Sequence, residues 1–242
     1  RRLLITFLLG CLLPFAVQAQ HGTFRFAQIT DIHFSPNNPN PTEDLLRSVA
    51  QINAIDSIDF VLVTGDITEE GDRATMLKVK ETLDLLKAKY YVILGNHETK
   101  WSDSGCTAFG EIFGGERFEF EHKGILFLGF NSGPLMRMDY GHVVPQDIRW
   151  MTEEMDKFGK DKPVILVTHY PLLDGDVDNW YEVTDAVRPY NIRLFIGGHY
   201  HRNRDLRYDG IPGILMRSNL RDKDGKPGYG IYDITKDSIL VY

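Results

Sequence analysis

Hydrophobic and polar positions in the first part of the chain follow two spacings, which predict strands separated by helices. Strand-length apolar runs lie at 24–30, 59–64 and 90–94. Between these runs, apolar residues recur at the spacing of one helix face. Thr42 is expected to cap a helix that runs to about 55, and Asp72 to cap a helix with apolar residues up to Leu86. This alternation is typical of a sheet with helices packed on its faces.

The second part of the chain has a different pattern, which predicts a hairpin, a long helix and several further strands. The hairpin is expected from 117–121 and 125–130 around a turn at 122–124. Helices are expected from about 146 to 158 and near 181–187, and the stretch 99–116 is expected to be a long loop. The remaining predicted strands are 163–168, 192–196, 205–208, 211–216, 228–234 and 238–241.

The first twenty residues have the pattern of a targeting segment. Arg1 and Arg2 precede an apolar run, and Ala19 offers a small residue for cleavage, so we expect a signal peptide over 1–19 and one domain over 20–242. The run is too short to indicate a membrane span. The alternative is a lipoprotein signal with Cys11 as the lipid-modified site. In both cases we expect an exported protein, periplasmic or secreted, with no other membrane contact.

Composition and charge exclude some classes of function. A length of 242 residues with 43% hydrophobic and 25% charged residues suits one globular domain. The formal net charge of -7 would become more negative without Arg1 and Arg2, which disfavours nucleic acid as the main partner. Loss of Cys11 would leave Cys106 as the single cysteine, so no internal disulfide is expected. Cys106 is interpreted as a loop or core residue and not as a nucleophile.

Polar side chains that bind metals follow five of the predicted strands. In open α/β sheets, ligands bind in the crevice beyond the carboxyl ends of the strands, so these side chains are expected to share one edge. A single histidine at a strand end is more often a structural residue than a metal ligand. Five strand ends with such residues would each need a separate structural explanation, so a shared metal site is favoured. The residues, in strand order, are Asp31, His33, Asp66, Asn96, His97, His169, His199 and His201.

The residue types and spacing predict a metal centre. In an extended chain, residues two apart face the same side, so Asp31 and His33 can face one pocket, as can His199 and His201. Imidazoles and carboxylates are the expected ligands of first-row metals such as Zn, Fe or Mn. Without His97 there are seven candidate ligands, which is more than one tetrahedral zinc ion binds. This number suits two divalent or trivalent ions, which a carboxylate such as Asp66 could bridge.

These residues lie in five short motifs that resemble those of the calcineurin-like metallophosphoesterases. All five motifs occur in the order of that family, and no member of its ligand set is missing. The complete ligand set counts against the possibility that this chain keeps the fold of the family only as a binding scaffold. Glu98 is a mild departure, because many relatives carry Asp there. The motifs are Asp31-Ile32-His33, Gly65-Asp66, Gly95-Asn96-His97-Glu98, Thr168-His169-Tyr170-Pro171 and Gly198-His199-Tyr200-His201.

The resemblance implies a fold and a division of the ligands. The fold would be an α/β four-layer sandwich, with two mixed β-sheets packed face to face and flanked by helices. Asp66 would bridge the two ions. The first ion would also be held by Asp31, His33 and His201. The second ion would also be held by Asn96, His169 and His199.

The resemblance also implies a reaction, the hydrolysis of a phosphomonoester or phosphodiester by a metal-activated water. His97 would lie near the phosphate with Asn96 and protonate the leaving alkoxide, which makes His97 and Asp66 the catalytic residues. Trp101 and Tyr170 are candidates for stacking on a base or sugar, with packing within their own loops as the equal alternative. The loops expected to choose the substrate are 34–41, 99–116, 132–145 and 172–180.

Two other functions remain open from the sequence. A nuclease could use the same site, although the acidic charge and the absence of a basic groove disfavour it. A non-enzymatic binding module could also be built on the same fold. The motifs are similar to those of the cyclic-nucleotide phosphodiesterase and related phosphatase branch, which suggests a small phosphoester without fixing which one.

Overall fold

The computed structural model describes residues 22–135, 137–221 and 226–242. The expected signal peptide and the alternative lipid site at Cys11 lie outside these residues. Among the helices within them, none is long and apolar enough to cross a membrane.

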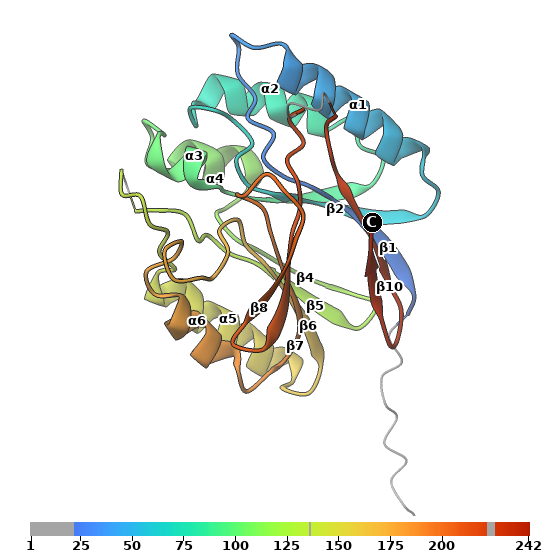
Figure 1. The fold of residues 1–242 in the computed structure, drawn as a ribbon, viewed down its shortest axis with the longest axis vertical. Helices are drawn as coiled ribbons and strands as arrows, with labels where there is room; N and C mark the ends of the chain where they lie inside the picture. Colours follow the sequence, from blue (N-terminus) through green and yellow to red (C-terminus); the bar gives the residue numbers. More distant parts are fainter. Residues whose placement is uncertain (1–21, 136, 222–225) are drawn as a thin grey trace, which may run out of the picture.

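The first sheet is formed mainly by the first part of the chain. Its elements and their connecting helices are β1 (Phe24–Ile29), α1 (Asn40–Ala54), β2 (Ile58–Thr64), α2 (Arg73–Leu83), β3 (Lys89–Ile93), β10 (Gly230–Ile234) and β11 (Ile239–Val241). The strand order is β11-β10-β1-β2-β3, with β1, β2 and β3 parallel and the last two strands added antiparallel. Helices α1 and α2 cover its outer face (Figure 1).

The second sheet is formed by the later part of the chain. Its elements are β4 (Phe118–His122), β5 (Ile125–Gly129), α5 (Pro145–Phe158), β6 (Pro163–Val167), α6 (Trp180–Val187), β7 (Asn191–Gly197), β8 (Arg204–Tyr208) and β9 (Ile211–Leu215). The order is β4-β5-β6-β7-β9-β8, with antiparallel strands at both edges. Strands β5 and β6 are apolar throughout because helices cover one face and the first sheet covers the other.

Aromatic side chains fill the layer between the two sheets. Phe26 stacks on Phe60 with ring centroids 4.9 Å apart, and Phe127 of the second sheet meets Phe26 edge-on at 5.7 Å. In Figure 1, α1 and α2 lie at the top and α5 and α6 at the bottom, with both sheets between them. The expected four-layer sandwich of two mixed sheets is confirmed.

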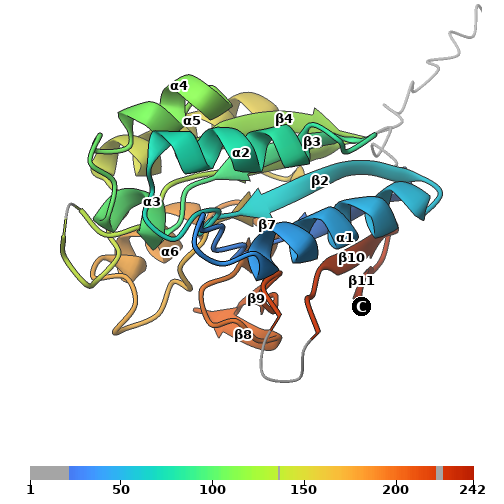
Figure 2. The ribbon, with the colours of Figure 1, turned by 90° about the horizontal axis from the view of Figure 1, so that it is seen from above.

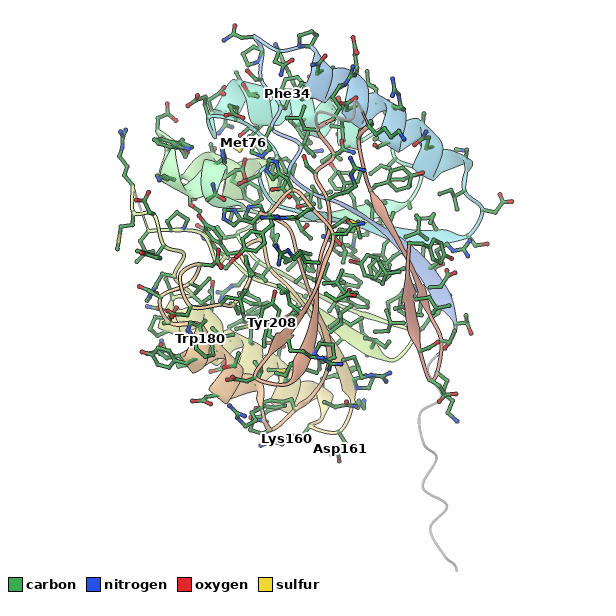
Figure 3. All side chains as sticks on the ribbon, in the orientation of Figure 1. Phe34, Met76, Lys160, Asp161, Trp180 and Tyr208 are labelled. Atoms are coloured by element: carbon green, nitrogen blue, oxygen red, sulfur yellow. The ribbon has the colours of Figure 1, made fainter. Side chains whose placement is uncertain are left out.

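Two further hydrophobic layers lie between each sheet and its own helices. Phe34 and Met76 belong to the layer under α1 and α2, and Tyr208 and Trp180 belong to the layer against α5 and α6 (Figure 3). Lys160 and Asp161, in the turn between α5 and β6, lie at the bottom of the view in Figure 3. These layers hold the strands in place by packing on the faces of the sheets, and they do not cover the carboxyl ends of the strands.

The structure corrects two predictions made at helix ends and in loops. Helix α1 is capped at Pro39 and not at Thr42, because Pro41 fits the first turn of a helix. The predicted loop 99–116 contains the end of one short helix, α3 (Asn96–Lys100), and the whole of another, α4 (Thr107–Phe113). Their brevity hid the helical spacing, although the Glu98 side chain accepts a hydrogen bond from the Gly95 N–H, an arrangement typical of a helix start.

Candidate metal centre

The carboxyl ends of β1, β2, β3, β6 and β7 meet at one edge of the molecule. Figure 2 shows β2 pointing toward the side where α3 lies, and α3 begins with Asn96 and His97. A cavity of about 300 Å³ opens there, and its wall includes predicted site residues together with Glu69 and Leu220. Its lining residues are His33, Asp66, Glu69, Asn96, His97, His199, His201 and Leu220.

One group of potential ligand atoms comes from the ends of β1 and β7. Atoms of Asp31, His33 and His201 lie within 4.8 Å of one another. The Nε2 atoms of the two histidines are 3.0 Å apart, and Asp31 Oδ1 lies 3.3 Å from His201 Nε2. Asp31 is fully buried, whereas His201 is 44% exposed and lines the cavity, so this group extends from the interior to the cavity.

A second group lies beside the first and includes Asp66. Atoms of Asp66, His169 and His199 lie within 4.8 Å of one another, and Asn96 Oδ1 is 3.1 Å from His169 Nε2. Asp66 Oδ2 is 3.1 Å from His169 Nε2 and 3.8 Å from His33 Nε2. One carboxylate oxygen therefore faces ligands of both groups, as a bridging residue requires.

His97 is fixed against the same carboxylate by its main chain. The His97 N–H donates to Asp66 Oδ1 at 2.9 Å, and His97 Nδ1 donates to the carbonyl oxygen of Glu69 at 2.6 Å. Its Nε2 atom points into the site, 3.9 Å from Asp66 Oδ2. Atoms of His33, Asp66 and His97 also lie within 4.8 Å of one another, so distance alone does not separate His97 from the ligands.

The backbone at the strand ends is not extended, which corrects the reasoning that placed the paired residues on one side. Residues on three of the strand ends have positive φ angles, a region that side chains other than glycine seldom adopt. Such backbone strain costs free energy and persists only where the surrounding structure enforces it. It is typical of functional sites. The residues and angles are Asp31 (51°), His33 (51°), Asp66 (48°), His199 (72°) and His201 (54°).

Two glycines allow these strand ends to approach closely. A Cβ atom at Gly95 would collide with the side chain and N–H of Asp66. A Cβ atom at Gly198 would lie 2.6 Å from Asp31 Oδ2. Both glycines are therefore needed for the carboxylates to reach their present positions.

Hydrogen bonds on the far side of the histidine rings orient two of the expected ligands. His33 Nδ1 donates to the Glu69 carboxylate at 3.0 Å, and His169 Nδ1 donates to the Thr64 carbonyl at 2.7 Å. These bonds place the proton on Nδ1 and leave Nε2 available to an ion, as in many metal sites. Sequence reasoning missed Glu69, although an acidic residue three positions after Asp66 was a usable signal.

The charges of the site alter the pKa values of its buried groups. Burial lowers the pKa of His169, but the nearby charge of Asp66 more than offsets this effect and raises the pKa to about 9. Burial lowers the pKa of His199 to about 3, and repulsion from His169 contributes. Burial would raise the pKa of Asp66, yet contact with His169 lowers it below its usual range, so the carboxylate is ionised.

The donor set fits transition-metal ions. Within the described residues, the charge partners of the buried Asp31 and Asp66 carboxylates are histidines. The facing nitrogens of His33 and His201 would repel each other unless a proton or an ion lay between them. Carboxylates and imidazoles with no thiolate are the expected ligands of Zn, Fe or Mn.

Glu98 connects the loops that carry Asp66 and His97. Its buried carboxylate accepts hydrogen bonds from Thr68 N, Thr68 Oγ1 and Gly95 N, each at 2.9 Å. Burial raises the pKa of Glu98, and the charge of Asp66 raises it further. Glu98, which stands where many relatives carry Asp, therefore joins the loop after Asp66 to the start of α3.

A comparison with protein families identifies the chain. The family model described as calcineurin-like phosphoesterase matches residues 24–203. The chain belongs to this family. The predicted family is confirmed, and the predicted enzyme class, a hydrolase of phosphoric ester bonds, is confirmed at the level of the family. The family is metal-dependent, in agreement with the groups of ligand atoms at the strand ends.

Several curated proteins are similar in sequence to this phosphoesterase chain. It is 27% identical over 199 residues to a probable glycerophosphodiester phosphodiesterase, GpdQ, of Arcobacter nitrofigilis, covering 72% of this chain and 71% of that protein. It is 23% identical over 212 residues to a 3',5'-cyclic-nucleotide phosphodiesterase of Nostoc, covering 79% and 78%. It is 28% identical to protein YvnB of Bacillus subtilis over 78% of this chain, but spans only 16% of that protein.

A solved structure supports the fold of this phosphoesterase chain. The protein TT1561 of Thermus thermophilus matches with a TM-score of 0.60 and 10% identity, covering 91% of this chain and 99% of that one. At this identity the likeness shows the fold alone.

The two aromatic residues predicted to contact substrate occupy different environments. Tyr170 is 5% exposed, its ring centroid lies 4.0 Å from that of His199, and its hydroxyl donates to the Asp139 carbonyl at 3.4 Å. Trp101 is 43% exposed at the end of α3, with Lys100 Nζ 5.1 Å from its ring centroid. Tyr170 thus packs against a histidine of the centre, whereas Trp101 lies largely open to solvent. Their contact with substrate stays a prediction.

Proposed function

We propose that this phosphoesterase uses two metal ions to hydrolyse a small phosphomonoester or phosphodiester. The observation that carries the proposal is the position of Asp66 Oδ2, which lies 3.1 Å from His169 of one ligand group and 3.8 Å from His33 of the other. A single-ion site would have no use for both groups. Asp31 and His201 complete one group, and the other includes Asn96 and His199.

The names of two relatives support a diester as the substrate. Both the Arcobacter and the Nostoc protein are named as phosphodiesterases, the second of cyclic nucleotides. The cavity at the centre is small and open, which suits a phosphate group whose substituents extend beyond it. A small phosphodiester, including a cyclic nucleotide, is therefore the substrate class that we favour.

The residues of the chain have distinct tasks in this proposal. Bound ions would supply Lewis-acid chemistry, lowering the pKa of a water and polarising the phosphoryl oxygens. His97 holds its Nδ1 proton against Glu69, so its Nε2 atom is the one that can give a proton to the leaving alkoxide. Asn96, at the start of α3, lines the same cavity as His97 and would contact the phosphate from that side. Water is the nucleophile, and no phosphorylated side chain should be trapped during turnover.

The experiment that tests the proposal compares two activated esters. The protein is stripped of metal, supplied in turn with Mn, Fe or Zn, and assayed on bis-nitrophenyl and mono-nitrophenyl phosphate. We expect metal-dependent hydrolysis, faster on the diester. Protein that takes up no metal and is inert on both esters would favour the non-enzymatic binding module, and strong salt-dependent binding and cleavage of single-stranded nucleic acid would favour the nuclease.

We further propose that the protein acts outside the cytoplasm. The basic start and apolar run of residues 1–19 support export, with the small residue Ala19 at the cleavage position. Cell fractionation and mass spectrometry of the mature chain test this. An N-terminus at Gln20 is the expected result, a lipid-modified Cys11 would show the lipoprotein alternative, and an unprocessed cytoplasmic chain would contradict export.

A further inference from the structure

Gln28 is a polar residue in the otherwise apolar layer between the two sheets. It is fully buried in β1 and follows Phe24 and Phe26 on the face that packs against the second sheet. Burying an amide costs free energy unless its hydrogen bonds are satisfied. An aliphatic side chain would fill this space without that requirement, so the amide points to a role beyond packing.

The amide of Gln28 connects three strands from two sheets. Its Nε2 atom donates to Thr64 Oγ1 and to the Gly197 carbonyl, each at 2.8 Å. Because a carbonyl can only accept, the nitrogen must be the atom that faces Gly197. The hydroxyl of Tyr232 donates to Gln28 Oε1 at 2.5 Å. Both ends of the amide are therefore satisfied, and its orientation is fixed.

The two partners of the amide nitrogen are the last residues of β2 and β7. Thr64 directly precedes Gly65-Asp66, and its carbonyl accepts the hydrogen bond from His169 Nδ1 at 2.7 Å. Gly197 directly precedes Gly198-His199, and the Gly198 N–H donates to the His169 carbonyl at 3.0 Å. Gln28 thus supports, through these two strand ends, every member of the group formed by Asp66, His169 and His199.

The other ligand group is oriented mainly by different residues, although the His199 N–H also donates to both carboxylate oxygens of Asp31 at 3.1 Å. His33 is held by the Glu69 carboxylate at 3.0 Å. Asp31 Oδ2 accepts from Thr30 Oγ1 at 2.7 Å, and the Asp31 carbonyl accepts from Ser218 Oγ at 2.7 Å. The hydrogen bonds of the Gln28 amide go to Thr64, Gly197 and Tyr232 instead. A change at Gln28 should therefore act on one ion more than on the other.

We infer that Gln28 is a positioning residue for one of the two proposed ions, the one that His169 and His199 would hold. It acts by fixing the ends of β2 and β7 relative to each other across the two sheets. This inference rests on the proposed two-metal function. It assigns a role to a buried residue that does not line the cavity and lies three positions before Asp31 in the chain.

The test is a calorimetric titration of metal-free protein with Mn²⁺. The variant Gln28→Met keeps the length of the side chain and removes its hydrogen bonds. We expect it to lower the affinity for one ion by about 10-fold or more, the usual effect of removing a group that orients a ligand. The affinity for the other ion should fall by a smaller factor, because that ion would share only Asp66 with the group that Gln28 supports.

Two controls separate positioning from a general loosening of the core. Tyr232→Phe removes the hydroxyl from the same buried network but leaves the bonds of the amide to β2 and β7, so both affinities should be retained. Glu69→Gln weakens the contact with His33 and should affect the opposite ion. If Gln28→Met does not fold, Thr64→Val removes one of the two bonds and should give a smaller loss for the same ion.

The possible results are distinguishable. Equal weakening of both ions in Gln28→Met, or no weakening of either, contradicts the role of Gln28 while the two-metal function stands. An unmodified protein that binds fewer than two Mn²⁺ ions contradicts the proposed function and this inference with it.

Discussion

At the scale of single residues, the proposed role of His97 as an acid needs a direct test, because its ring lies among the possible ligand atoms. Its main chain is fixed by Asp66 and its Nδ1 by Glu69, which leaves Nε2 for proton transfer. We predict that His97→Ala retains bound metal and loses rate by about 10²–10⁴-fold, the usual contribution of a general acid. The loss should be smallest for nitrophenyl esters, whose leaving groups need no proton.

The control for this variant is His122→Ala, at the end of β4 and away from the strand ends that form the site. It should leave both metal content and rate unchanged. An empty metal site in His97→Ala would show that His97 is a ligand, and the division of roles would then be wrong.

Asp66 is predicted to be the residue whose loss removes both ions. Its carboxylate faces His169 and His33, and its backbone adopts a positive φ of 48°. Asp66→Ala should lose most bound metal, measured by plasma mass spectrometry, and nearly all activity on bis-nitrophenyl phosphate. Retention of one ion per chain together with full activity would contradict a bridging role.

The gathering of the candidate ligands at one edge could be predicted from sequence, because each candidate follows a predicted strand within a short motif. The residues that orient them could not. Gln28 looks like an ordinary strand residue, and its role depends on β7, which lies 169 positions away along the chain. The positive φ angles at Asp31 and His33 were also hidden, because spacing alone suggests an extended chain.

At the scale of elements, helix α2 shows a cap that sequence predicted correctly. The Asp72 side chain accepts a hydrogen bond from Thr75 N at 2.9 Å. Asp72→Ala should lower the free energy of unfolding by about 1 kcal/mol, the typical cost of losing such a cap. Asp72→Asn keeps an acceptor and should retain most of the stability in urea unfolding. Equal losses in both variants would show that the cap is not the cause.

The hairpin β4–β5 is joined to the first sheet by an ionic contact that should depend on pH. His122 and Lys123 contact Asp59 Oδ2 at 3.0 and 2.8 Å. Burial raises the pKa of Asp59, but the hydrogen bonds from Lys123 and His122 lower it more, so the folded-state pKa lies below the usual range. The contact therefore stabilises the fold above the unfolded pKa of about 3.9, and this contribution is lost as pH falls through the folded pKa.

Asp59→Asn should consequently destabilise the protein at neutral pH by no more than about 1 kcal/mol, because solvent screens this partly exposed contact. The difference from the unmodified protein should vanish at a pH below both pKa values. Urea unfolding across this range measures it. Asp56→Asn, an exposed change three positions earlier, is the matched control. A difference that grows at low pH would contradict the sign.

At the scale of the whole molecule, the site exists because two sheets bring five strand ends to one edge. The strands themselves were predictable from their apolar runs. Their distribution between the two sheets was not predictable. Strand β10 pairs with β1, although all strands of the second sheet lie between these two in the sequence. Packing of Phe26 against Phe127 supports this arrangement, and no local pattern records such a contact.

The central claim is that both ligand groups must hold an ion for hydrolysis. The most direct measurement titrates chelator-treated protein with Mn²⁺ and follows metal content and bis-nitrophenyl phosphate hydrolysis together. The account predicts that the rate continues to rise until two ions are bound per chain and then reaches a plateau. Full activity with a single ion, or activity that persists in the metal-free protein, would contradict it.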